Sequence, residues 1–171
     1  MSGLDRVEIE WATANDIEGA IAVLCEIADF RKSLGQDRWK KDWFTPVALQ
    51  GWIDARQLVV ARLEGKVIGT MLLEDEDPIF WPDDPPGEAL YVHRLTRTRT
   101  GAGAKGLAQR FLAFAQEEAG RRGRAYVRLD CALDETLCAI YDRAGFTRQK
   151  GVWEVAPDFH SWCWEKAVSA V

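Results

Sequence analysis

The most constraining feature of this sequence is a strand, a glycine-rich turn and a helix that follow one another directly. Apolar residues dominate Ala89–Leu95 and predict a strand, and after the turn apolar side chains recur at helical spacing. These side chains are Leu107, Phe111, Phe114, Ala115 and Ala119. The turn reads GAGAKG, residues 101–106, and its small residues leave the first N–H groups of the helix open to a phosphate. The segment therefore predicts a pyrophosphate cradle at a helix start.

The charge of this segment supports an anionic ligand. The chain carries 22 basic and 27 acidic side chains, a net charge of -5, yet residues 89–116 contain no acidic side chain. The basic side chains there are Arg94, Arg97, Arg99, Lys105 and Arg110. An acidic chain without a broader basic surface is a poor partner for the phosphate backbone of nucleic acid, so we expect no such partner.

The turn also matches the GxGxxG fingerprint of dinucleotide-binding enzymes, which leaves a nicotinamide- or flavin-dependent oxidoreductase as an alternative. Residues 96–100 separate the strand from the first glycine, and Asp130 lies 24 residues beyond Gly106, whereas the fingerprint expects an acidic residue after about 20. Too little chain follows Asp130 for a second nucleotide-binding half. A P-loop is excluded because no Gly-Lys-Ser/Thr follows the turn.

The rest of the chain alternates strands and helices, which predicts a mixed α/β fold. Expected strands are residues 7–12, 57–63, 66–73, 89–95, 125–131, 146–155 and 161–168, with a hairpin turn at 64–65. Four helices are expected. One begins near Ile17, and the others cover residues 47–53, 107–119 and 135–143. The acidic, proline-rich residues 74–88 predict a long surface loop. With 171 residues, we expect one domain with helices on both faces of a mixed sheet.

Cysteine and histidine usage argues against a metal centre. The four cysteines form no CxxC pair and only two histidines, His93 and His160, are present, so we expect free thiols in a reducing cytoplasm and no metal site. The sequence has no run of 18 apolar residues, and its first residues, MSGLDRVEIEW, lack the apolar stretch of a signal peptide. The expectation is a cytoplasmic protein with no membrane partner.

Four segments of the chain together resemble the GNAT superfamily of N-acetyltransferases in their order and spacing. They are Tyr91–Thr96, Gly103–Ala108, Arg128–Cys131 and Ile140–Phe146, within a core of residues 89–146. The resemblance implies a mixed, mostly antiparallel sheet of about six or seven strands, splayed between the fourth and fifth strands and flanked by about four helices. It also implies a single domain over residues 1–171 that transfers an acetyl group from acetyl-CoA to a primary amine of a small molecule or peptide N-terminus.

Two positions depart from the pattern of the family. Its signature reads Arg/Gln-x-x-Gly-x-Gly/Ala; Gly106 and Ala108 match, but Gly103 replaces the leading Arg or Gln. Asp134 stands where the superfamily often has Asn. A weakened cofactor site keeps a second interpretation open, a non-catalytic GNAT module that only binds acyl-CoA.

For the cofactor, the resemblance implies two sets of contacts. The pantetheine arm would add to the strand at Leu95, Thr96 and Arg97 through backbone hydrogen bonds, and the diphosphate would rest on amides at the helix start. The second set comprises Gly103, Ala104, Lys105, Gly106, Leu107, Ala108 and Gln109, and Asp134 and Tyr141 are also expected near coenzyme A.

For the reaction, the resemblance assigns proton donation to the departing thiolate to Tyr141, and oxyanion stabilisation to a backbone N–H near Leu95. The base that deprotonates the amine is left open. The candidates are His93 and, acting through water, Glu74, Glu76 or Asp130. Packing of the short helix is the alternative role of Tyr141, and a structural hydrogen bond is the alternative role of His93.

For the acceptor, Trp39 and Trp43 lie in a loop, residues 31–43, that resembles the substrate-side loop of small-molecule members. Glu74 and Asp130 are further candidates, because carboxylates attract a cationic amine. Core packing is the alternative interpretation of the tryptophans. The sequence leaves formation of a homodimer open.

Overall fold

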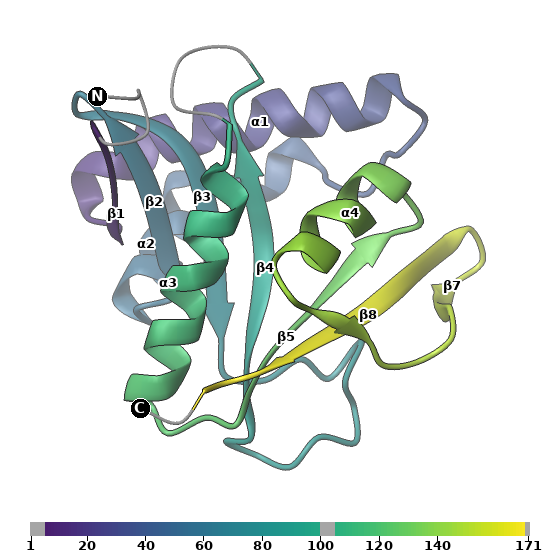
Figure 1. Cartoon of the computed structure of the whole chain (residues 1–171). Helices are drawn as coiled ribbons and strands as arrows, with labels where there is room; N and C mark the ends of the chain where they lie inside the picture. Colours follow the sequence, from purple (N-terminus) through teal and green to yellow (C-terminus); the bar gives the residue numbers. More distant parts are fainter. Residues whose placement is uncertain (1–5, 100–104, 170–171) are drawn as a thin grey trace. The chain divides into compact units, whose positions relative to one another are not determined.

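The computed structural model of the chain describes residues 6–99 and 105–169 (Figure 1). The chain forms two compact units. The first unit comprises Met1–Leu72 and Arg94–Phe111, and the second comprises Leu73–His93 and Leu112–Val171. Three elements pass from one unit into the other, namely β3 (Lys66–Glu74), β4 (Ala89–Arg97) and α3 (Leu107–Arg121).

The described strands form one eight-stranded sheet. Its order is β1 (Val7–Trp11), β2 (Leu58–Leu63), β3, β4, β5 (Tyr126–Ala132), β8 (Phe159–Ala167) and β6 (Thr147–Arg148), with β7 (Trp153–Ala156) paired to β8. β4 and β5 (Tyr126–Ala132) run parallel, whereas β1–β2, β2–β3 and the three ladders to β8 are antiparallel. The parallel ladder ends at Val92 and Leu129 although both strands continue, as a splay between them requires. Four α-helices accompany the sheet in the described part of the chain. The predicted α/β class with a mixed, mostly antiparallel sheet is confirmed.

Two short strands account for the difference between the eight strands observed and the smaller number expected. We predicted one strand over residues 146–155, but the chain forms β6 (Thr147–Arg148) and β7 (Trp153–Ala156), which both pair with β8 (Phe159–Ala167). Between them the chain bends at Lys150, whose Nζ donates a hydrogen bond to the carbonyl oxygen of Phe80 at 2.8 Å. This contact with a segment distant in sequence holds the chain away from a continuous strand.

In the first unit, one apolar cluster joins α1 (Ile17–Ser33) and α2 (Pro46–Asp54) to the hairpin of β2 (Leu58–Leu63) and β3. Its fully buried members include Leu24, Leu49 and Val60. The hairpin turns at Glu64 and Gly65, both with positive φ (53° and 79°), which is the backbone of a type I′ turn. The predicted turn at residues 64–65 is therefore confirmed.

The start of α1 is fixed by a buried carboxylate that follows β1 (Val7–Trp11). Asp16 Oδ2 accepts hydrogen bonds from the backbone N–H and the hydroxyl of Thr13, at 2.8 and 3.0 Å. Arg62 Nε on β2 donates to Asp16 Oδ1 at 2.7 Å. Burial alone would raise the pKa of Asp16, but the hydrogen bonds from Arg62 and Thr13 outweigh it and hold this pKa below its ordinary value.

A glycine on β3 sets the distance between β3, β4 and the start of α3 in the first unit. A Cβ atom on Gly69 would lie 2.9 Å from the carbonyl oxygen of Thr96, 2.9 Å from the Phe111 ring and 3.1 Å from Leu107 Cδ2. No side chain fits at those distances, so only glycine allows this approach. Gly69 thereby holds the beginning of α3 against the strand segment Leu95–Arg97.

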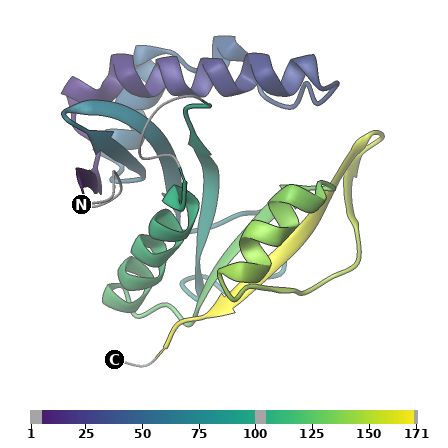
Figure 2. The same cartoon turned by 45° about the horizontal axis from the view of Figure 1, so that its top comes forward.

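In the second unit, α4 (Glu135–Arg143) follows β5 and lies along β5 and β8 (Figure 2). Gly145, with φ of 82°, follows the helix, as expected for a glycine C-terminal signal. The buried face of α4 carries Cys138 and Tyr141. None of the helices in the described ranges has the length and apolar composition that a membrane crossing requires.

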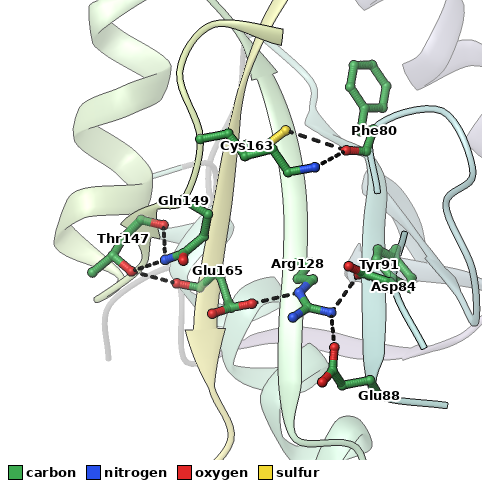
Figure 3. Close-up of polar contacts among 10 residues, drawn as sticks. Phe80, Asp84, Glu88, Tyr91, Arg128, Thr147, Gln149, Cys163 and Glu165 are labelled. Atoms are coloured by element: carbon green, nitrogen blue, oxygen red, sulfur yellow. Dashed lines mark hydrogen bonds and ion pairs between the residues drawn. The ribbon is translucent and has the colours of Figure 1, made fainter. Parts of the chain in front are cut away.

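Residues 75–88 form no strand, as predicted, but this segment is more than a solvated surface loop. Phe80 and Trp81 are buried, and Arg128 on β5 anchors the segment. Arg128 Nη1 donates to Asp84 Oδ2 and Glu88 Oε2 at 2.6 and 2.7 Å, and its Nε donates to Glu165 Oε2 at 2.7 Å (Figure 3). The guanidinium also lies over the Trp81 ring at 4.9 Å. These contacts, which composition alone does not show, order the segment.

Candidate active site

The structure divides the residues predicted for chemistry between the two units. His93, Glu74, Asp130 and Tyr141 lie in the second unit, and Leu95, Trp39 and Trp43 lie in the first. The division falls within β4, because one segment of the second unit ends at His93 and one segment of the first unit begins at Arg94. A single strand therefore carries residues of both groups.

In the second unit, three strand or loop carboxylates approach His93. Its Nε2 lies 3.4 Å from Glu74 Oε2 and 3.4 Å from Asp77 Oδ2, and its Nδ1 lies 3.9 Å from Asp130 Oδ1. The Ser161 hydroxyl donates to Asp130 Oδ2 at 3.1 Å and orients that carboxylate. We call Glu74, Asp77, His93 and Asp130 the acid–imidazole cluster. It combines a side chain able to accept a proton with negative charge able to attract an ammonium group.

Asp77 is a member of this cluster that the predictions from the sequence do not include. Glu76, one of the predicted candidates, is exposed and is not among the carboxylates that the structure shows beside His93. Asp77 is buried because its Oδ1 accepts hydrogen bonds from the N–H groups of Ile79 and Phe80, at 3.2 and 3.1 Å. The Asp-Pro pair that begins this turn was the available signal, since Asp commonly caps a turn with its own side chain.

Tyr141 is buried in α4 and packs against two aromatic rings. Its ring centroid lies 6.3 Å from that of Phe146 and 5.9 Å from that of Trp164. This environment fixes the orientation of the ring and agrees with the packing role considered for this residue. The structure does not test the proposed proton donation, which stays a prediction.

Asp134 has a structural task at the start of the same helix. Its carboxylate caps α4 by accepting hydrogen bonds from the N–H groups of Thr136 and Leu137, at 2.8 and 3.3 Å. The side chain therefore faces its own helix. This is the orientation in which a carboxylate interferes least with a phosphate-bearing ligand.

The buried cysteines of this unit are poor nucleophiles. Burial raises the pKa of Cys131 to about 12 and that of Cys163 to about 11, so thiolate is scarce at neutral pH. Cys138, on the buried face of α4, is 1% exposed and belongs to the core. Covalent catalysis through these three thiols is therefore disfavoured.

In the first unit, β4 is irregular immediately before the segment expected to hold pantetheine. Arg94 has φ of 51°, a left-handed conformation that breaks the regular strand and redirects the following residues. The Thr70 hydroxyl on β3 donates to the carbonyl oxygen of Arg94 at 3.1 Å and holds this irregularity in place. Leu95 and Thr96 beyond it are half-buried, and Arg97 is exposed. A ligand can therefore approach the end of this strand.

The predicted phosphate cradle is described only in its second half. Gly103 and Ala104 lie outside the described residues. Lys105 and Gly106 are exposed, Leu107 is buried, and Ala108 and Gln109 are half-buried in the first turn of α3. Gly106 has φ of 79°, a conformation that strains other residues, so glycine is required there for a local reason. The described half agrees with a cradle, and its role stays a prediction.

The two predicted substrate tryptophans gather around Arg94. Its guanidinium carbon lies 5.1 Å from the centroid of the Trp39 ring and 5.6 Å from that of Trp43, and it is also close to Phe44. Trp39 meets Phe44 edge to face, with ring centroids 6.1 Å apart, and Trp43 is 48% exposed. The loop is thus attached to β4 beside Leu95. In the sequence, Arg94 is only one of several basic residues of this segment.

The mixed sheet with its parallel β4–β5 pair and four helices has the fold of solved GNAT-family acetyltransferases. No protein-family model matches the chain. It is 26% identical over 145 residues to the uncharacterized N-acetyltransferase YesJ of Bacillus subtilis, an alignment that covers 79% of this chain and 78% of that protein. The predicted resemblance to the GNAT superfamily is confirmed.

Solved structures of the same fold cover nearly the whole chain. A GNAT-family acetyltransferase from Streptococcus agalactiae matches with a TM-score of 0.75 at 20% identity, over 94% of this chain and 95% of that one. The PaiA N-acetyltransferase of Thermoplasma acidophilum, in complex with coenzyme A, matches with a TM-score of 0.72 at 16% identity over 94% and 98%. YncA of Salmonella typhimurium, a putative acetyltransferase with acetyl-CoA, matches with a TM-score of 0.72 at 17% identity over 96% and 95%.

Proposed function

We propose that this chain is an acetyl-CoA-dependent N-acetyltransferase whose acceptor is a primary amine of a small molecule or of a peptide N-terminus. The observation that carries the proposal is the composition of β4. This strand bears His93 among three carboxylates, and two residues later it enters the segment that the resemblance assigns to the cofactor. A relative named as an N-acetyltransferase and neighbours with bound coenzyme A or acetyl-CoA support it.

The described residues fit an acyl-CoA ligand at the start of α3. Gly106 is exposed and places no side chain before the buried Leu107, so a phosphate can approach the first N–H groups of this helix. Leu95–Arg97 would add backbone hydrogen bonds to pantetheine, and the N–H of Leu95 would stabilise the oxyanion. Acetyl-CoA supplies the acetyl group as a thioester, which an amine can attack.

His93 is the base in this proposal. The amine nitrogen must lose a proton to attack, and His93 accepts that proton directly or through one water. The carboxylates around His93 stabilise the imidazolium that forms, and they favour the approach of a cationic amine. Glu74 is suited to meet the acceptor because its side chain is 33% exposed, whereas that of Asp77 is 3% exposed.

Tyr141 is the proton donor to the departing thiolate. The packing of its ring on Phe146 and Trp164 fixes the direction of the hydroxyl, which a positioned acid requires. Trp39 and Trp43 are the proposed acceptor contacts in the first unit, where Arg94 holds their loop in place. We infer further that both units act as one domain, since three elements cross from one unit to the other.

A non-catalytic acyl-CoA-binding module is the second candidate, because Gly103 lacks the side chain that the family signature has there. The test is release of free coenzyme A from acetyl-CoA, measured with a thiol reagent across a panel of small amines and short peptides. The proposal expects amine-dependent release. Saturable acetyl-CoA binding without release for any amine would favour the binding module, and preference for NAD(H) over acetyl-CoA would favour the oxidoreductase.

A further inference from the structure

Asp77 is the least satisfied carboxylate of the acid–imidazole cluster. Its side chain is 3% exposed, and the two backbone N–H groups of the following turn satisfy Oδ1. Oδ2 is buried and makes no hydrogen bond within the described residues, although it lies 3.4 Å from His93 Nε2. A buried carboxylate oxygen without a partner is unfavourable, so a fold that retains it has a use for it.

The geometry around this oxygen is that of a set of metal ligands. One imidazole nitrogen of His93 and one carboxylate oxygen from each of Asp77 and Asp130 lie within 4.8 Å of one another. Ligand atoms about 2.1 Å from a tetrahedral zinc ion lie ~3.4 Å apart. The His93–Asp77 pair already has that spacing at Nε2, whereas Asp130 approaches the other ring nitrogen, at 3.9 Å from Nδ1, and must turn toward the ion to bind it.

The charge of the cluster also favours a cation. Three carboxylates face a single imidazole, and protonation of His93 supplies one positive charge. We propose that Asp77, His93 and Asp130 bind one divalent transition-metal ion, with zinc as the favoured ion. The partly exposed Glu74 is placed to add a fourth ligand, because its Oε2 also lies 3.4 Å from His93 Nε2.

The donor set selects among divalent ions. One imidazole nitrogen with carboxylate oxygens suits zinc, cobalt, nickel or manganese, whereas magnesium and calcium prefer oxygen ligands alone. Two of the carboxylates are already oriented by second partners. Ser161 donates to Asp130, and backbone N–H groups donate to Asp77, as outer hydrogen bonds commonly do around metal ligands.

A bound ion would have a consequence for catalysis that rests on the proposed function. The ion occupies a nitrogen lone pair of His93, the same group that accepts the proton of the amine. Zinc is therefore an inhibitor of acetyl transfer and competes with the acceptor. Binding of the ion itself does not depend on the chain being an acetyltransferase.

The test is metal binding by the full chain after treatment with a chelator, without acetyl-CoA. Zinc binding is followed by calorimetry, and cobalt binding by the visible absorption of the ion. The chain has two histidines, which gives a matched control: His160 lies 3.8 Å from Glu154 in an exposed pair. We expect one zinc per chain, at least tenfold weaker binding in Asp77→Asn and His93→Gln, and unchanged binding in His160→Gln.

A spectroscopic readout on the unmodified chain covers the case in which a variant fails to fold. The nitrogen resonances of the two imidazoles are recorded by NMR as zinc is added. The proposal expects the His93 signals to shift and those of His160 to stay in place. Absence of stoichiometric binding, equal affinity in His93→Gln, or a shift of the His160 signals would overturn it. Acetyl transfer measured in chelator is a separate result, so failure of either proposal is distinguishable from failure of the other.

Discussion

Two groups of carboxylates in the second unit differ in how their charge is balanced. Around Arg128, three carboxylates share one permanent cation, and aromatic rings cover the guanidinium (Figure 3). Around His93, three carboxylates share an imidazole that is charged only when protonated, and one buried oxygen has no hydrogen bond in the part of the chain that the structure describes. The first arrangement is complete within the protein, whereas the second becomes complete only with a proton, an amine or a metal ion. The first therefore stabilises the fold, and the second is available for function.

Removal of the Arg128 guanidinium should have the largest effect on stability. Arg128→Ala leaves Asp84, Glu88 and Glu165 without their partner in a half-buried site, and we expect the free energy of unfolding to fall by about 4 kcal/mol. Urea denaturation measures this loss. Arg128→Lys, which keeps the charge but not the forked geometry, should lose less. Equal stability of Arg128→Ala and the unmodified chain would contradict the structural role.

Removal of the imidazole should act on catalysis instead. His93→Gln should lower kcat of acetyl transfer about 100-fold, the usual contribution of a general base, while acetyl-CoA affinity stays within twofold. Steady-state kinetics and calorimetry separate the two quantities, and His160→Gln is the control. If the variant keeps full kcat, His93 is not the base.

The ion pair of Asp16 and Arg62 in the first unit should stabilise the fold, as the contacts of Arg128 do in the second. The pKa of Asp16 is lowered by its hydrogen bonds, so its contribution to stability is present above its unfolded-state pKa near 4 and disappears as the pH falls through the lower folded-state value. Asp16→Asn should cost about 2 kcal/mol at pH 7 and progressively less below pH ~4. Urea denaturation across this pH range checks it, and a loss independent of pH would contradict the ion pair with Arg62.

The smallest expected effect is an increase in the free energy of unfolding, whereas Arg128→Ala and Asp16→Asn lower it. Asp77→Asn removes an unbalanced buried charge but keeps an oxygen for the two backbone N–H groups, so in chelator we expect the variant to be more stable by about 1 kcal/mol. Saturating zinc should reverse the order, because the unmodified chain binds zinc more tightly than the variant and gains more stability from it. Thermal unfolding with and without zinc measures both quantities. If Asp77→Asn is less stable than the unmodified chain in chelator, the negative charge of Asp77 is already offset within the cluster and the prediction is wrong.

Elements whose ends depend on neighbouring residues were predicted correctly from the sequence. The helix over residues 135–143 has the predicted bounds, because Asp134 caps its start and Gly145 follows its end. The hairpin turn at Glu64–Gly65 also depends only on neighbouring residues. The break between β6 and β7 depends on a distant residue, since Lys150 donates a hydrogen bond to Phe80, 70 residues away in sequence.

The sequence predicted those site residues whose side chains can react and which lie on predicted strands. It did not predict the residue whose place in the site depends on burial by a turn. His93, Glu74 and Asp130 come together because each lies on one of the strands β3, β4 and β5. Asp77 and Glu76 are both acidic and one position apart, and only the turn at Ile79–Phe80 buries the first and leaves the second exposed. The sequence contained no metal-ligand spacing because the three proposed ligands come from separate segments.

The central claim is that the beginning of α3 binds the diphosphate of acetyl-CoA, and calorimetric titration of acetyl-CoA into two variants of Gly106 tests it most directly. Both variants place a side chain at a φ of 79° and share that strain, but Gly106→Glu adds a negative charge and Gly106→Ala does not. The account predicts a loss of binding of at least 100-fold in Gly106→Glu and of less than tenfold in Gly106→Ala. Equal affinity of the two variants for acetyl-CoA would place the diphosphate elsewhere and contradict the account.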